Sequence, residues 1–280
     1  LIAGQYTGSL NNAGETIRLT DAWDGNVFKF SYNDGYGWPV SADGPGHSLV
    51  PIDSAIAGQH DGTLEYGGNW RASTYMKGSP GAADPTPIAG ILINEVMAHT
   101  DYSNPSYPDY DSNDWIELYN TTGASIAYNS NWYLTDNPDN LKKWPLPSGS
   151  IAANGRVAFD EVAGFHSPMT SGFGLDKTGE YVILSYLPGT SADRVVDYVR
   201  FAGQYNTISW GRISDGAAWW QFLGNPGTRG TANANPVQRP VVISEIMYHP
   251  EEGTTEEEYV ELYNTTGSAV NLYNDYGTWR

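Results

Sequence analysis

Four aspartates fall in one short stretch of the chain that is also rich in asparagine, serine and proline. They are Asp101, Asp109, Asp111 and Asp114. Calcium takes about six to eight oxygen ligands and is commonly held by Asp-rich loops, so this stretch is a candidate site with calcium as the one candidate cofactor. The spacing matches no EF-hand, and the corresponding stretch at 251–258 keeps the acidity without keeping the positions. A solvated acidic loop is the alternative, and it is the interpretation that we favour.

A second group of side chains has the chemistry to bind carbohydrate. Four tryptophans lie in or beside predicted loops, where an exposed ring can stack on a sugar: Trp38, Trp70, Trp219 and Trp220. Surface glycans are therefore a candidate class of partner. The alternative is that most of these rings are structural, because aromatic side chains bury large areas and dominate the cores of β-proteins.

Two glutamates, Glu95 and Glu245, each interrupt an otherwise apolar stretch. A partly buried carboxylate costs free energy unless it is paired or hydrogen-bonded. Each is a metal ligand or charged contact in one interpretation. In the other, which we favour, each accepts hydrogen bonds from neighbouring backbone N–H groups or pairs with an arginine.

Motifs of catalysis are absent from the sequence. His99 and His249 stand without a neighbouring histidine or cysteine. There is no Gly-x-Ser-x-Gly elbow, no His-Glu-x-x-His and no phosphate-binding glycine loop. We therefore expect no catalytic residues and a protein that is not an enzyme.

The composition excludes several classes of function. Among 280 residues, 32 are acidic and 14 basic, which gives a formal net charge of -18. This charge repels phosphate backbones, so we expect no nucleic-acid partner. The chain has no cysteine, which excludes disulfides and thiol chemistry. No apolar run reaches the ~20 residues that cross a bilayer, so we expect no membrane insertion of this segment.

The candidate residues must be positioned by β-strands. Glycine, proline, tyrosine and tryptophan are frequent and no helical periodicity is sustained, which favours an all-β protein. Strands are predicted at 16–19, 27–32, 91–97, 115–119, 157–159, 181–185, 195–201 and 241–247. Glu117 is predicted to face outward from its strand. The positions predicted to face the core are Ile116, Leu118, Val182, Leu184 and Val199.

The chain also repeats itself. Residues 91–99 return at 241–249, residues 115–123 return at 259–267, and residues 10–15 match 175–180. Such repeats are the sequence signature of a tandem architecture. They predict a C-terminal portion of one domain at 1–85, a complete domain at 88–235 and an N-terminal portion of a third at 239–280. The Pro- and Gly-rich stretches 78–87 and 224–236 are predicted linkers.

The repeated phrases resemble the lamin tail domain in its bacterial extracellular form. The resemblance is carried by residues 93–97, 115–120, 132–136, 179–180, 182–184, 197–199 and 225–227, with 242–250 and 258–263 in the third copy. It implies an immunoglobulin-like β-sandwich in tandem repeats. It also implies a binding or structural module without catalytic machinery, in a secreted or cell-surface protein.

From this resemblance we expect a non-enzymatic extracellular segment of structural or adhesive repeats, within a larger secreted or surface protein. The alternative is a carbohydrate-binding accessory region of a secreted hydrolase. The Asn-Thr-Thr sequences that begin at Asn120 and Asn264 match the N-glycosylation sequon, but we expect them to form turns.

The two partial domains need a cover for their apolar faces, supplied by neighbouring domains of the same polypeptide or by another copy of the chain. The two portions together lack a counterpart of residues 134–165. We therefore expect a segment of a longer, repeat-built chain, such as a surface fibre or stalk.

Overall fold

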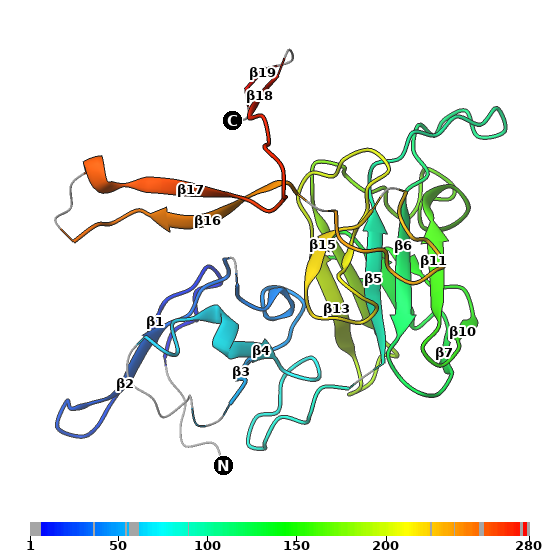
Figure 1. The fold of residues 1–280 in the computed structure, drawn as a ribbon. Coiled ribbons are helices and arrows are strands. Elements are labelled where there is room, and N and C mark those ends of the chain that lie inside the picture. Colours follow the sequence, from blue (N-terminus) through cyan, green and yellow to red (C-terminus); the bar gives the residue numbers. More distant parts are fainter. Residues whose placement is uncertain are drawn as a thin grey trace. The chain divides into compact units, whose positions relative to one another are not determined.

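The regular secondary structure of the chain is almost entirely antiparallel β, which confirms the predicted all-β class (Figure 1). The computed structural model describes residues 7–35, 37–53, 55, 62–88, 90–224, 226–237, 239–251, 255–274 and 277–278. Two compact units are present, Leu1–Asn235 and Pro236–Arg280. The first unit includes both of the first two predicted domains, so the boundary at 85–88 stays a prediction. Within the described residues, no helix has the length and apolarity needed to cross a membrane.

Residues 88–235 contain two sheets. The five-stranded sheet has the order β11-β6-β5-β14-β15, and the four-stranded sheet has the order β13-β12-β8-β9. The bounds are β5 (Ile91–Met97), β6 (Trp115–Asn120), β8 (Trp132–Thr135), β9 (Trp144–Pro145), β11 (Arg156–Asp160), β12 (Tyr181–Tyr186), β13 (Arg194–Arg200), β14 (Trp210–Arg212) and β15 (Trp220–Phe222). A further pair joins β7 (Ile126–Tyr128) to β10 (Gly149–Ile151), and the short helical segment η4 (Glu161–Phe165) follows β11.

The two sheets share one hydrophobic core, and the five predicted core positions all lie in it. Ile116 and Leu118 come from β6, Val182 and Leu184 from β12, and Val199 from β13. Alternation along each strand sends every second side chain inward, which is why these positions are buried together. Leu184 and Ile116 are not exposed to solvent at all.

Glu117 faces outward from its strand, as predicted, but it does not face solvent. It points away from the core, as the alternation requires, yet its exposed fraction is 0%. The segment at 226–235 covers this face of the sheet and places donors on the carboxylate. Outward therefore does not mean solvated at this position.

The N-terminal part of the first unit consists of two hairpins. One pairs β1 (Thr16–Thr20) with β2 (Asn26–Ser31), and the other pairs β3 (Leu49–Pro51) with β4 (Trp70–Ala72). Two short 3-10 helices, η1 (Val40–Ala42) and η3 (Gly67–Asn69), lie between these strands in the sequence.

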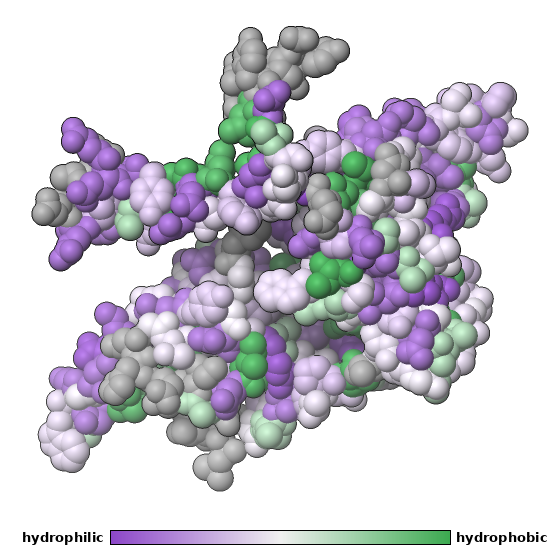
Figure 2. Space-filling model, viewed as in Figure 1, coloured by the Kyte–Doolittle hydropathy of each residue, from purple (hydrophilic) through white to green (hydrophobic). Residues whose placement is uncertain are grey.

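The second unit is built around the hairpin of β16 (Val241–Met247) and β17 (Tyr259–Asn264). It also contains η5 (Thr255–Glu257), β18 (Tyr273–Asn274) and β19 (Gly277–Thr278). Apolar side chains are exposed along both strands of the hairpin, among them Ile243 at 61% and Leu262 at 50%. Figure 2 shows hydrophobic residues on the surface of this hairpin.

Candidate functional site

A connected polar network lies on the outer face of the five-stranded sheet, opposite the hydrophobic core. It starts at Glu95 of β5, which is fully buried. The backbone N–H of Thr228 donates to one carboxylate oxygen at 2.8 Å, and the Thr228 hydroxyl donates to the other at 2.8 Å. The Ser209 hydroxyl donates to this carboxylate as well. Hydrogen bonding to a backbone N–H, the favoured interpretation of Glu95, is confirmed.

Glu117 of β6 extends the network on the neighbouring strand. The Asn94 side-chain amide donates to it at 3.0 Å, and the Gly230 N–H donates at 2.6 Å. The Arg156 guanidinium lies 3.9 Å away. Burial raises the pKa of Glu117, and the nearby charge of Glu95 raises it further, while the donors from Asn94 and Gly230 lower it. Protein donors therefore take the place of water around the Glu117 side chain.

Asn94 joins the two glutamates to the loops. It lies where the β5–β6 register shifts between Ile93 and Glu95, and such a bulge re-aims side chains. Its amide nitrogen also donates to Asp215 at 2.9 Å and to the Asn233 side chain at 2.8 Å. Asp215 in turn pairs with the Arg156 guanidinium. Four separate parts of the sequence therefore meet at one side chain.

Arg212 of β14 links this network to the four-stranded sheet. Its guanidinium donates to Asp197 of β13 at 2.8 Å and to the Ile93 carbonyl at 2.7 Å. The Ile93 N–H donates to the same Asp197 oxygen at 2.8 Å. Burial raises the pKa of Asp197, and the Arg212 charge opposes this. The guanidinium also lies over the Trp220 ring, 4.9 Å from its centroid.

The stretch at 224–236 is not the free linker that its composition predicts. Thr228 and Gly230 bind the two buried glutamates, and Asn233 donates to the Arg212 carbonyl at 2.7 Å. Gly227 allows this close approach, since a Cβ there would stand 2.7 Å from Met97 and 2.9 Å from Trp115. Buried carboxylates need donors, and this segment supplies them. Asn225, part of the family resemblance, lies outside the described residues.

The predicted linker at 78–87 is anchored in the same way. Asp84 accepts hydrogen bonds from the Arg71 guanidinium at 2.5 Å, from the Thr74 N–H at 3.0 Å and from the Ser79 hydroxyl at 3.0 Å. Burial alone would raise the pKa of Asp84, but these donors outweigh it and lower the pKa. A carboxylate thus fixes each of the two Pro- and Gly-rich stretches.

The acidic loop brings only some of its aspartates together. Asp101, Asp111 and Asp114 line a pocket of about 540 Å³ that also includes Asp176 and Lys177, and Asp109 is not among its lining residues. No cluster of three or more histidine, aspartate or glutamate side chains with metal-binding geometry occurs among the described residues. Calcium therefore stays a prediction from the sequence.

Asp114 has a structural role within that loop. It is buried and accepts from the Thr100 N–H at 3.1 Å and the Thr100 hydroxyl at 2.7 Å. Burial raises its pKa to about 7, and the charge of Glu161 acts in the same direction, while the Thr100 donors lower it.

The four predicted glycan-binding tryptophans occupy different environments. Trp38 stacks on Trp70, and the Trp70 indole N–H donates to the Leu64 carbonyl at 2.8 Å. Trp220 packs against the core beneath Arg212. Trp219 alone of the four presents most of its surface to solvent, with 76% exposed.

Trp23 is not among the four predicted carbohydrate contacts, although it is 89% exposed. It lies in the turn between β1 and β2, where its backbone N–H donates to Asp21. The signal is present in the sequence, since this tryptophan directly precedes Asp24 and Gly25, two residue types that favour turns.

The two sequon asparagines form turns. The Asn120 amide donates to the carbonyls of Ala124, Ile151 and Ala152, and its oxygen accepts from Thr122. Asn264 donates to the Ser268 carbonyl in the corresponding position. The prediction of turns at both sites is confirmed.

Comparison with known proteins adds no relative: no family model, no curated protein and no solved structure matches the chain.

Proposed function

We propose that the chain is a non-enzymatic segment of tandem immunoglobulin-like sandwiches of the lamin-tail type. Its role is structural or adhesive, within a larger extracellular or cell-surface protein. The observation that carries the proposal is the recurrence of one pairing scheme in both compact units. In β5–β6, Ile93 pairs with Leu118 and Glu95 with Glu117, with a register shift between them. In β16–β17, Ile243 pairs with Leu262 and Glu245 with Glu261, with the same shift.

The turns that follow these hairpins support the same reading. Thr122 donates its N–H to the Asn120 side chain at 2.9 Å, and Thr266 donates its N–H to the Asn264 side chain at 2.9 Å. Sequence repetition alone would not require the hydrogen bonds to recur. Their recurrence supports a repeated domain.

The N-terminal hairpins support a third copy. β1–β2 matches β12–β13, since Ile17 pairs with Phe30 as Val182 pairs with Val199. Gly14 and Gly179 precede these strands with φ of 99° and 117°, in a region that favours glycine. A Cβ at Gly14 would clash with the Tyr32 carbonyl, and one at Gly179 would clash with the Phe201 carbonyl.

The state of the carboxylates supports a structural rather than a chemical role. Donors from the protein occupy both oxygens of Glu95, and Glu117 is held by Asn94 and Gly230. These groups fix the 226–235 segment to the sheet. A protein that carries mechanical load benefits from such cross-links between its strands and its loops.

Single-molecule stretching tests the structural function. We expect one cooperative unfolding event for residues 88–235, with a contour-length gain of about 50 nm. The Glu95→Ala chain should unfold at lower force, because the 226–235 segment loses its anchor. A chain that extends without a resolved unfolding event would contradict a load-bearing role.

A carbohydrate-binding accessory region is the second candidate, favoured by the exposure of Trp219 and Trp23. A glycan array with the wild-type chain and the Trp219→Ala and Trp23→Ala variants decides between the two. Specific binding that disappears with either substitution would replace the structural proposal. Trp220→Ala is an unsuitable control because that ring packs against the core.

A further inference from the structure

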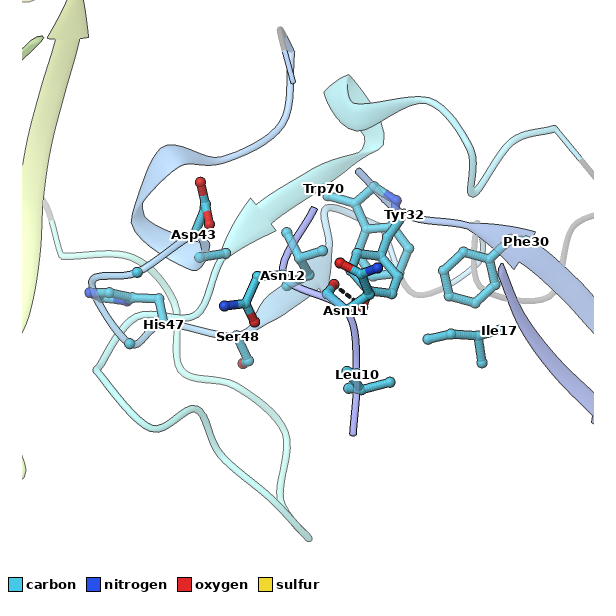
Figure 3. A pocket seen from close by; sticks show the side chains of 14 residues that line it. Leu10, Asn11, Asn12, Ile17, Phe30, Tyr32, Asp43, His47, Ser48 and Trp70 are labelled. Carbon is cyan, nitrogen blue, oxygen red and sulfur yellow. Dashed lines mark hydrogen bonds between the residues drawn. The ribbon is translucent and has the colours of Figure 1, made fainter. Parts of the chain in front are cut away.

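The N-terminal part of the first unit carries a pocket of about 680 Å³ (Figure 3). The pocket is lined in part by apolar and aromatic side chains from β1, β2, β3 and β4, from the residues that precede β1 and from the residue that follows β2. These are Leu10, Ile17, Phe30, Tyr32, Leu49 and Trp70.

Each of these six residues has a counterpart in the complete domain that belongs to its hydrophobic core or packs against it. The matched hairpins β1–β2 with β12–β13, and β3–β4 with β14–β15, set the correspondence. The counterparts, in the same order, are Leu175, Val182, Val199, Phe201, Trp210 and Trp220. The pocket is therefore lined like one side of that core.

In the complete domain the β5–β6 hairpin is one of the elements that supply the rest of that core. Its residues Ile93, Val96, Ile116 and Leu118 are all 0% exposed. β5 also pairs with β14, where Val96 lies opposite Trp210 and Glu95 opposite Gly211.

The corresponding edge of β3 is open among the described residues, because β3 pairs only with β4. Ser48 and Ile52 make the β4-side hydrogen bonds, with Ser73 and Asn69. Antiparallel alternation then turns the N–H and C=O of Leu49 toward the open edge. An open strand edge is a template for pairing with another strand.

The chain itself carries a hairpin of the matching kind. The β16–β17 residues Ile243, Ile246, Val260 and Leu262 correspond to the four buried β5–β6 residues and are 61%, 55%, 57% and 50% exposed. Exposure of these side chains to water costs free energy, and this cost is removed when an apolar surface covers them.

We propose that the β16–β17 hairpin of a second copy of this chain docks into the pocket and pairs with the open edge of β3. Ile246 then lies opposite Leu49 and Glu245 opposite Val50, as Val96 and Glu95 lie opposite Trp210 and Gly211. Ser48 lines the pocket and offers its hydroxyl to Glu245, as Ser209 does to Glu95. The contact repeats an interface that already exists within the complete domain.

The contact does not need a counterpart of residues 134–165. That stretch includes β11, which borders β6 on the side away from β5 and does not touch β14. The edge that meets β3 is therefore intact in β16. A contact between two different surfaces leaves a free hairpin and a free pocket at the ends, so copies add head to tail. The inference rests on the proposed function, because it assumes the repeat organisation. It adds that the partner is a second copy of the chain.

Sedimentation of the full chain across a wide concentration range tests the proposal. We expect reversible association that Ile243→Asn weakens by about tenfold or more. Val242→Asn is the matched control, because Val242 is the adjacent residue and its counterpart Leu92 is not a member of the core. A chain that stays monomeric at every concentration overturns the proposal, and so does equal weakening by both substitutions.

Mixing two variants tests the pairing directly. The Ile243→Asn chain keeps its pocket, and the Leu49→Asn chain keeps its hairpin. Each should be monomeric alone, and an equal mixture should form a heterodimer. No association in the mixture overturns the proposal, provided that circular dichroism shows both variants folded.

Hydrogen exchange of the wild-type chain covers the case in which a variant does not fold. The Leu49 amide should become protected as the concentration rises, and unchanged exchange overturns the proposal. A monomeric chain with a normal stretching profile would remove this inference alone, whereas a missing unfolding event would remove the proposed function.

Discussion

Glu95 and Glu117 lie directly opposite each other across β5 and β6, and neither side chain is exposed to solvent. Like charges in facing positions destabilise a sheet, and burial raises the cost of each charge. Five donors offset that cost: Ser209, the N–H and hydroxyl of Thr228, Asn94 and Gly230. The pair therefore ties the sheet to the 226–235 segment, and its stability depends on that segment.

Glu95→Ala should lower the free energy of unfolding by ~2–4 kcal/mol, because Thr228 and Ser209 lose their buried acceptor. Urea denaturation measures this. The control is Glu245→Ala at the same repeat position, where the side chain is exposed and the expected change is within ~0.5 kcal/mol at low protein concentration. Equal losses for the two variants would show that burial of Glu95 does not matter.

Asp114 predicts a dependence of stability on pH. Its folded pKa of about 7 lies above the ordinary aspartate pKa of 3.8, so the folded state holds this proton more tightly. The contribution is present at low pH and is lost as pH rises through about 7, with an upper limit of ~4 kcal/mol at ~1.4 kcal/mol per pKa unit. Asp114→Asn should flatten the change in unfolding free energy between pH 4 and 7. An unchanged pH profile in this variant would contradict the assignment to Asp114.

The environment of His47 predicts the opposite dependence of stability on pH. Its Nε2 accepts the Val195 N–H at 2.9 Å, so the ring is neutral and Nδ1 donates to the Ser73 carbonyl at 2.6 Å. Burial lowers the pKa of His47, although the Ser73 contact and the charge of Asp84 oppose this. The contribution is present above about pH 6.5 and is lost as pH falls below it.

Hydrogen exchange of the Val195 amide measures this loss. Its protection factor, the ratio of the intrinsic to the observed exchange rate, should be lower at about pH 5 than at about pH 7.5. His47→Gln should remove the pH-dependent part, and His249→Gln, an exposed position, should keep it. Retention of the effect in His47→Gln would assign it to another group.

Calcium binding by the acidic loop has a direct check. A bound ion would raise the melting temperature between chelator and millimolar calcium, because it binds only the folded state. Asp111→Asn, in the pocket that Asp101 and Asp111 line, should then reduce the rise, while Asp109→Asn should reduce it less. Identical melting curves with and without calcium would leave the solvated acidic loop as the interpretation.

The long strands could be predicted from the sequence, because the alternation of apolar and polar residues becomes visible only over several residues. Each of the eight predicted strands is present, with ends within one residue. β3 and β14 have three residues each and β9 has two, too few for a period to show, and the partners across the sheet decide their structure.

The polar network could be predicted only in part. Glu95 stood out because it interrupts an apolar strand, and the expectation of a hydrogen-bonded carboxylate was right. Its partner Thr228 is 133 residues away and lies in a stretch whose composition predicts a linker. Asn94, Asp215 and Asn233 come from distant segments, and no local pattern marks residues that meet only through tertiary packing.

The repeat places two leucines at the same position of the sequence pattern but in different surroundings. Leu118 and Leu262 occupy the same position in the same pairing scheme, opposite Ile93 and Ile243. Leu118 is 0% exposed in the core, and Leu262 is 50% exposed.

Leu118→Ala should therefore lower the unfolding free energy by ~2–4 kcal/mol through lost burial and a cavity. Leu262→Ala should change it by no more than ~0.5 kcal/mol in dilute protein. Urea denaturation of the two variants at the same low concentration measures both. A large loss for Leu262→Ala in dilute protein would mean that the hairpin is already covered within the single chain, which would contradict docking of a second copy.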